Sequence, residues 1–242
     1  MTDLGPVGVY LPISFTTTAP AGAQRDAARR LERAGYRTVW TNEVVGGKDA
    51  LVQLAILLAA TETLRFGTGI ANIWAREPQV LHAAAAQLAE AYPGRLVLGI
   101  GAGYREQAAA AGRDYGSPLR TVRDYLSRMA ATTSPPAPAA EYPRLLAANG
   151  PKMLALAAEL ADGAFPAGQP PEFTAAARAT LGPGKLLVTG LTVATDDPEI
   201  PAKARAHLAA GADHVVLLPP HGDDFAAAVE ELERLAPAFG TL

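Results

Sequence analysis

Short apolar runs alternate along the chain with alanine-rich segments of helical periodicity. The first two apolar runs, at residues 7–13 and 38–41, are rich in β-branched side chains, which favour strands. Between them, Ala27, Ala28 and Leu31 lie one to four positions apart, as on the buried face of an amphipathic helix. The pattern therefore predicts a strand, a helix and a second strand in this opening part of the chain.

The same strand–helix unit recurs to the end of the sequence. The predicted strands are residues 7–13, 38–41, 64–70, 96–100, 144–148, 163–166, 185–195 and 214–218. The predicted helices are residues 21–34, 49–61, a segment that begins near 78, and then 117–130, 149–160, 172–181, 200–210 and 223–235. Eight units in 242 residues predict a (β/α)₈ TIM barrel in a single domain over residues 1–242. Strand–helix alternation alone leaves a doubly wound open sheet as the alternative.

A ligand site is expected where the predicted strands end, because barrels of this kind bind ligands at the carboxyl ends of their strands. The third and fourth strands both run into glycines, in the segments GTGI at 67–70 and GAG at 101–103. Glycine lets a flat ligand approach the main chain closely, so these two segments could form the bed of a cofactor. The polar residues expected at other strand ends are Ser14, Asn42, Glu43, Asn149, Lys152 and His221.

Composition and charge narrow the possible functions. The chain is 49% apolar, which is enough for a large core, and its net charge of -3 with no basic run argues against nucleic-acid binding. It has no cysteine, which excludes disulfides, thiolate catalysis and cysteine-based metal sites, and no metal-ligand cluster is visible. The start is acidic, and the most apolar run, 51–60, is too short for a bilayer. We therefore expect a cytoplasmic protein with no membrane contact.

Three stretches of the sequence resemble the bacterial luciferase-like monooxygenase family. They are GTGIANIWAREP at 67–78, YPGRLVLGIGAG at 92–103 and ANGPKM at 148–153. Within the family the chain is most similar to the deazaflavin-dependent oxidoreductases of actinobacteria. The resemblance implies a (β/α)₈ barrel that uses a deazaflavin, coenzyme F420, for hydride transfer to or from a small organic substrate. An FMN-dependent monooxygenase and a truncated, non-catalytic flavin-binding protein are the alternatives.

The resemblance also implies where the cofactor binds. The pair Gly69-Ile70 would form a bulge with a non-proline cis peptide bond behind the cofactor ring. The segment 101–103 would line the ring and its ribityl chain, and the segment 148–151 would receive the phosphate, with added charge from Lys152. The residues assigned to the cofactor are Gly69, Ile70, Ala71, Gly101, Ala102, Gly103, Ala148, Asn149, Gly150, Pro151 and Lys152.

Elementary physics supports the phosphate position, because unpaired N–H groups and the helix dipole favour an anion at a helix N-terminus. The plain alternative is an ordinary helix start, in which Asn149 caps the helix and Pro151 occupies its first turn.

Two residues are candidates for proton transfer. Glu43 ends the second strand, where similar enzymes carry an acid followed by a histidine; here Val44 follows, so Glu43 could contact the ring or be a plain loop charge. His221 follows the eighth strand on the ligand side and could exchange a proton near neutral pH. Structural roles are expected for the other histidines, which are His82, His207 and His214.

The helix at 51–60 indicates self-association. Apolar residues occupy nearly every position, so one side stays exposed after the other packs on the barrel. A homodimer through the second and third helices would cover that side, and a charge at Leu57 is expected to disrupt it. The chain is also shorter than typical family members in the segments that usually cover the active site, so the sequence does not indicate the substrate.

Overall fold

The computed structural model describes residues 3–194 and 197–240, over which helices and strands alternate as predicted. The strands are β1 Val7–Tyr10, β2 Thr38–Thr41, β3 Arg65–Thr68, β4 Ala71–Asn72, β5 Leu96–Gly101, β6 Arg144–Ala147, β7 Gly163–Phe165, β8 Leu186–Thr192 and β9 His214–Leu218. The helices are α1 Ala21–Arg33, α2 Ala50–Leu58, α3 Pro78–Ala91, α4 Arg105–Ala110, α5 Pro118–Met129, α6 Pro151–Leu160, α7 Pro171–Leu181, α8 Ile200–Ala209, α9 Phe225–Leu235 and the 3-10 helix η1 Ala236–Phe239.

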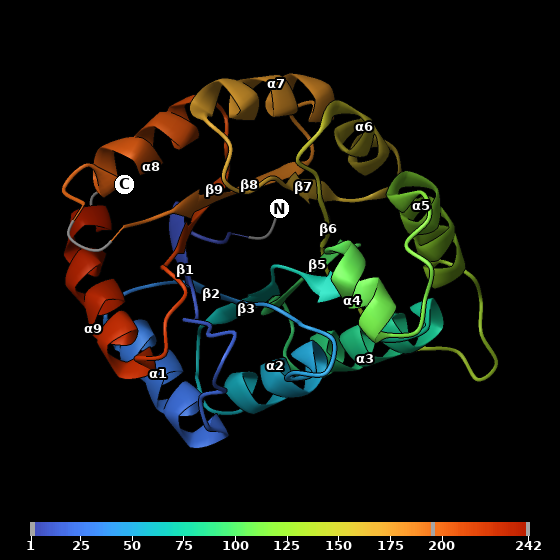
Figure 1. Ribbon diagram of the computed structural model, residues 1–242, viewed down its shortest axis with the longest axis horizontal. Coiled ribbons are helices and arrows are strands. Elements are labelled where there is room, and N and C mark those ends of the chain that lie inside the picture. The colour runs from blue at the N-terminus through green and yellow to red at the C-terminus, as the bar shows by residue number, and fades with distance from the viewer. Residues whose placement is uncertain (1–2, 195–196, 241–242) are drawn as a thin grey trace.

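The strands form a closed parallel barrel inside a ring of helices (Figure 1). Their order is β3-β2-β1-β9-β8-β7-β6-β5-β4, and β3 also pairs with β5. The parallel pairing of Phe66 with Leu96 joins those two strands and closes the ring, while the short β4 extends β3 along the far end of β5. The predicted (β/α)₈ barrel is confirmed, and the open-sheet alternative is wrong.

Side chains from alternate strand positions fill the inside of the barrel. Trp40 of β2 and Phe165 of β7 meet edge to face, with ring centroids 4.9 Å apart. Tyr10, Val97 and Val216 pack around them in the same buried cluster. A filled axis leaves binding to the loops at the barrel end, as in other barrels of this class.

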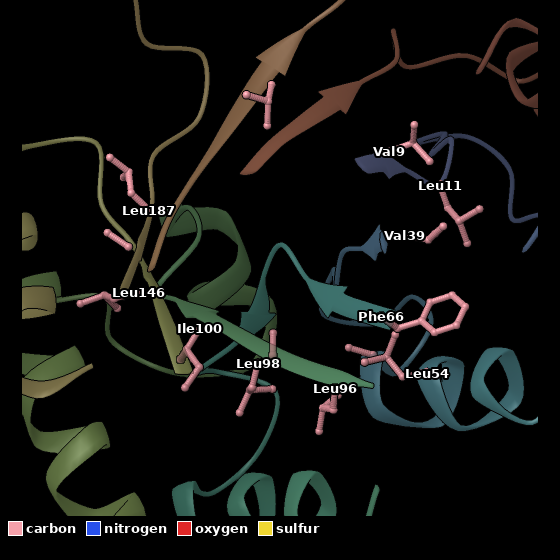
Figure 2. Close-up of a cluster of buried hydrophobic side chains, with 14 of the residues drawn as sticks. Val9, Leu11, Val39, Leu54, Phe66, Leu96, Leu98, Ile100, Leu146 and Leu187 are labelled. Carbon is pink, nitrogen blue, oxygen red and sulfur yellow. The ribbon is translucent and has the colours of Figure 1, made fainter. Parts of the chain in front are cut away.

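The other face of each strand packs against the helices. Val39, Phe66 and Leu96 belong to this outer layer, with Leu54 of α2 (Figure 2), and each is at most 2% exposed. Burying an apolar side chain of this size contributes about 1.5–3 kcal/mol. This layer fixes the helices against the strands. It thereby positions the loops that join each strand to the following helix at the mouth of the barrel.

Two predicted strands are shorter than expected. The run 7–13 forms a strand only to Tyr10; Leu11 N still donates to Trp40 O at 2.8 Å, but Pro12 has no N–H with which to continue the ladder. The run 185–195 forms a strand over Leu186–Thr192, and its last residue lies outside the described part of the chain.

The run 64–70 is not one strand, because it is interrupted before β4. Strand β3 stops at Thr68, immediately before a cis peptide bond between Gly69 and Ile70, and β4 begins at Ala71. The predicted helix 49–61 is likewise shorter, ending at Leu58.

Helix α4 is an element that the sequence did not indicate. It follows β5 and lies within the ring of helices (Figure 1). The side chain of Gln107 anchors it, because its Oε1 accepts hydrogen bonds from Tyr104 N at 3.1 Å and from Asn72 Nδ2 at 2.9 Å.

Over the described ranges, none of the helices has the length and apolarity that crossing a membrane requires.

Candidate functional site

The bulge after β3 contains the predicted cis peptide bond, between Gly69 and Ile70. Gly69 N donates to Thr41 O at 2.7 Å, and the hydroxyl of Tyr10 donates to Gly69 O. A Cβ atom on Gly69 would lie 2.6 Å from the ring of Phe165, so a larger residue does not fit. The bulge is therefore fixed by β1 and β2 on one side and by the aromatic filling of the barrel on the other.

The end of β5 lies directly beside this bulge. Ala71 pairs with Ile100 and Asn72 with Gly101, so the two predicted glycine segments come together in space. A Cβ atom on Gly101 would lie 2.6 Å from Cδ1 of Ile70 and 3.0 Å from Cβ of Ala147, so a side chain there would displace that of Ile70. Together the bulge and β5 form a surface of main chain at the barrel mouth.

Aromatic side chains border this surface on the β5 side. Trp74 Nε1 donates to Ala102 O at 2.6 Å, and the hydroxyl of Tyr115 donates to Gly103 O at 3.1 Å. The two rings lie 5.9 Å apart, so they form one wall. Tyr104 is 74% exposed at the start of α4 and does not join it.

Helix α6 begins at the neighbouring strand end without a side-chain cap. Its N-cap residue is Gly150, with Pro151 in the first turn, and Asn149 Oδ1 instead accepts a hydrogen bond from Ala167 N at 2.9 Å. The prediction that Asn149 caps the helix is therefore wrong, whereas Pro151 does occupy the first turn as expected. A Cβ atom on Gly150 would meet nothing within 4 Å, so the first turn faces open space, and Lys152 is exposed beside it. Free N–H groups and the helix dipole favour an anion here.

Glu43 is buried just after β2, and both oxygens of its carboxylate accept hydrogen bonds. Its Oε2 accepts hydrogen bonds from Asn72 N at 2.8 Å and Arg76 Nη1 at 3.1 Å. Its Oε1 accepts from Ala50 N at 3.1 Å and from Arg76 Nη2. The carboxylate thus ties together the start of α2, strand β4 and the loop before α3.

Arg76 completes a charged cluster with Glu43 and Asp49. Its Nη2 lies 2.6 Å from Asp49 Oδ2, and its side chain is 11% exposed. Burial alone would lower the pKa of Arg76, but the hydrogen bonds and charges of Glu43 and Asp49 outweigh burial and raise that pKa. The cluster is a rigid link between two mouth loops.

His221 lies on the mouth side of the barrel but on its exposed rim. Its ring meets that of Phe15 edge to face at 4.6 Å, and Phe15 is itself 71% exposed. The adjacent Asp223 accepts a hydrogen bond from Ser14 Oγ at 2.5 Å, which joins the loops after β1 and β9. No contact within the described residues links His221 to the bulge.

The remaining histidines are packed into the framework. His214 is buried with Nδ1 2.6 Å from Gly5 O, and its Nε2 accepts a hydrogen bond from Trp40 Nε1 at 3.1 Å. Burial lowers the pKa of His214 to about 4, so its ring is neutral at pH 7. His207 Nδ1 lies 2.8 Å from Thr174 Oγ1, and His82 Nδ1 lies 2.6 Å from the Tyr142 hydroxyl.

The structure thus brings Gly69, Ile70, Ala71 and the 101–103 segment together, whereas His221 and Lys152 stand at the periphery. Sequence reasoning missed Tyr10, Arg76 and Phe165. The period-two alternation of β1 could have placed Tyr10 inside the barrel, but no pattern pairs Arg76 with Glu43. Across residues 3–194 and 197–240, no group of three or more His, Asp or Glu side chains could hold a metal ion.

Comparison with known proteins gives matches over nearly the whole chain. A family described as luciferase-like monooxygenase matches residues 6–236. A 5,10-methylenetetrahydromethanopterin reductase of Methanolobus tindarius is 27% identical over 184 residues, which cover 69% of this chain and 56% of that one. The chain spans about half the length of the curated relatives it matches.

Solved structures share the fold. An F420-dependent secondary alcohol dehydrogenase in complex with an F420-acetone adduct has a TM-score of 0.78 at 15% identity, with 96% of this chain and 98% of that chain covered. A monooxygenase from Streptomyces bottropensis has a TM-score of 0.74 at 15% identity, with the same two coverages. At these identities the likeness shows the barrel architecture.

Proposed function

Because this chain belongs to the luciferase-like monooxygenase family, we propose that it is an oxidoreductase that uses coenzyme F420 to transfer hydride to or from a small organic substrate. The observation that carries this proposal is the main-chain surface of the bulge and β5 next to the uncapped start of α6. A flat ring with a phosphate-bearing chain needs those two features side by side. The names of several relatives and structural neighbours, which include F420-dependent enzymes, also support the choice of cofactor.

The residues present fit such a group. The bulge offers a surface on which the close approach of Phe165 excludes a side chain at position 69, and a side chain at position 101 would displace that of Ile70. The first turn of α6 has open space in front of Gly150, with the charge of Lys152 nearby. Coenzyme F420, when bound, supplies two-electron hydride chemistry. The protein would position its ring, exclude water below it and bind its phosphate at α6.

Catalytic roles for Glu43 and His221 stay predictions. The contacts of Glu43 with Arg76 and two backbone N–H groups support a role in holding the mouth loops. His221 lies at the rim, where it could reach a substrate that covers the cofactor.

Titration calorimetry with coenzyme F420 and, separately, with FMN tests the proposal. We expect micromolar binding of F420, which corresponds to about -8 kcal/mol, and much weaker binding of FMN. Binding of neither would contradict it, and the chain would then be studied as a barrel that has lost its cofactor.

Two alternatives keep the same fold with a different activity. An FMN-dependent monooxygenase is supported by the structural likeness to the Streptomyces bottropensis monooxygenase, and it predicts FMN binding with substrate-dependent oxygen consumption. A non-catalytic flavin-binding protein predicts cofactor binding with no turnover of any substrate in a screen.

We further propose that the protein is a homodimer through α2 and α3. Val52 and Ile56 on α2 are 60% and 36% exposed, and Val80 on the neighbouring α3 is 56% exposed, so an apolar patch runs from the outer side of α2 to the start of α3. Exposed apolar patches of this kind mark interaction sites.

The single-domain organisation and the cytoplasmic location stay predictions.

A further inference from the structure

A polar pocket lies between the barrel wall and the helices, where β1 and β2 end beside the starts of α1 and α2. It has a cavity volume of about 100 Å³. Thr41 of β2 lines the pocket from the outer face of its strand, the face on which Val39 also lies. Gln24 of α1 and Gln53 of α2 line it from the helix side. The volume is several times what one water molecule requires, so a ligand of a few heavy atoms fits.

One buried polar atom in this pocket, the hydroxyl oxygen of Thr41, lacks a protein partner among the described residues. Thr41 is 1% exposed, and its Oγ1 forms no hydrogen bond in the described part of the chain. Gln24 and Gln53 are 7% and 8% exposed and line the same pocket, but their side-chain amides are not among the buried polar atoms without a partner. Buried polar groups are almost always paired, because an unpaired one costs about 1–3 kcal/mol. The unpaired Thr41 hydroxyl, with the two glutamine amides facing the same cavity, therefore points to a polar molecule that pairs with them.

The charges around the pocket select the kind of molecule. Lys48 lines it and makes no ion pair with any described residue, while the lining contains no acidic side chain. The acidic Asp49 pairs with Arg76, and the carboxylate of Asp223 accepts hydrogen bonds from the hydroxyls of Ser14 and Thr16 at the rim. Helix α1 starts beside the pocket with no side-chain cap and no acid in its first turn, so its positive end adds to the same potential.

From these contacts we propose that the pocket binds a small aliphatic carboxylate. Its carboxylate would pair with the Lys48 ammonium and accept from the amides of Gln24 and Gln53, while the Thr41 hydroxyl would donate to it. The apolar part of the ligand would contact Leu11 and Ile13, which also line the pocket. This site is separate from the proposed cofactor surface, although Thr41 contributes to both: its carbonyl holds Gly69 and its side chain lines the pocket.

Saturation-transfer NMR and calorimetry with propionate, and with propionamide as a neutral probe of the same shape, test the proposal. Propionate is expected to bind at least about ten-fold more tightly than propionamide, because a charge-assisted hydrogen bond is roughly twice as strong as a neutral one. Lys48→Met should weaken propionate binding about ten-fold or more and leave coenzyme F420 binding unchanged. The matched control is Lys203→Met on α8, which removes the same charge from an exposed site and should leave propionate binding unchanged.

Thr41→Val supplies a second test that does not depend on charge. The substitution keeps the shape and removes a hydroxyl that has no protein partner, so the folded state should be at least as stable as the wild type. Propionate binding should nevertheless weaken. The proposal is overturned if propionate does not bind at tens of millimolar, if propionamide binds equally well, or if Lys48→Met and Thr41→Val both bind propionate like the wild type.

Discussion

The hydroxyl of Tyr10, on β1, donates a hydrogen bond to the carbonyl oxygen of Gly69, in the bulge after β3. Burial raises the pKa of Tyr10 far above its usual value, so the phenol keeps its proton at every physiological pH. The first strand of the chain thereby positions the backbone on which the cofactor ring is proposed to lie.

Tyr10→Phe removes this donor and leaves the Gly69 carbonyl without it. We expect a loss of about 1–2 kcal/mol in the free energy of unfolding and about ten-fold weaker cofactor binding, measured by urea denaturation and calorimetry. Tyr36→Phe is the matched control, because the Tyr36 hydroxyl donates to Leu232 O at 2.7 Å, away from the mouth. It should show a similar loss of stability with unchanged cofactor affinity; equal affinity loss in both variants would contradict a local role for Tyr10.

Gly150→Asp places a carboxylate where the cofactor phosphate is proposed to bind. The backbone of Gly150 is extended and its Cβ position is open, so the fold should tolerate aspartate, which is also a good N-cap for α6. We expect unchanged or higher thermal stability and loss of cofactor binding by calorimetry. Gly150→Ser supplies a neutral cap as the control and should retain most of the affinity. Unchanged affinity in Gly150→Asp would move the phosphate elsewhere.

Arg76→Met leaves the buried carboxylate of Glu43 without its cation. Removal of one partner from a buried ion pair typically costs about 3–5 kcal/mol, and we expect a loss of that order in urea denaturation. Arg123→Met breaks the exposed pair between Arg123 and Glu159 and should cost less than about 1 kcal/mol. Similar small losses in both variants would mean that the Glu43 cluster does not hold the mouth loops.

Val52→Glu, on the exposed side of α2, tests the proposed dimer. The expectation that Leu57 lies on that side is wrong: Leu57 is fully buried, since α2 turns it toward the barrel, so a charge there would test folding. Val52 is 60% exposed, and glutamate there should leave the folded monomer intact but weaken the dimer at least ten-fold in light scattering. A dimer of unchanged stability would place the interface elsewhere.

His214 should make stability fall as the pH is lowered. Its pKa is about 4 in the folded protein and about 6.5 when unfolded, so between these values only the unfolded state takes up its proton. The folded protein therefore loses stability as the pH falls below about 6.5, by up to about 3 kcal/mol near pH 4. His214→Gln, which does not titrate, should lose correspondingly less between pH 7 and pH 4 in urea denaturation. Parallel curves would contradict the assignment.

The barrel and most of its elements could be predicted because the apolar residues of each strand and each helix recur at the spacing typical of that element. The run at 38–41 and the helix around Leu31 are apolar at strand and helix spacing, and that is the signal that local physics leaves in a sequence. The glycines at 69 and 101 also indicated the mouth from the sequence: a side chain at 69 would clash with Phe165, and one at 101 would displace that of Ile70.

The features that could not be predicted depend on contacts between distant residues. Nothing in the sequence near Asn149 indicates that its side chain accepts a hydrogen bond from Ala167 N, which leaves α6 without a side-chain cap. The helix at 51–60 is apolar on all sides, so its sequence does not indicate which residues face the barrel. For this reason the sequence wrongly places Leu57 on the exposed side. The pairing of Glu43 with Arg76 likewise joins loops 33 positions apart.

The rings of Trp40 and Phe165 close the barrel axis beneath the mouth, and this has a kinetic consequence. A molecule lying on the bulge can enter and leave only from above, so a second molecule stacked over it must arrive later and depart first. If substrate lies over cofactor here, turnover should follow a compulsory order, with the cofactor first on and last off.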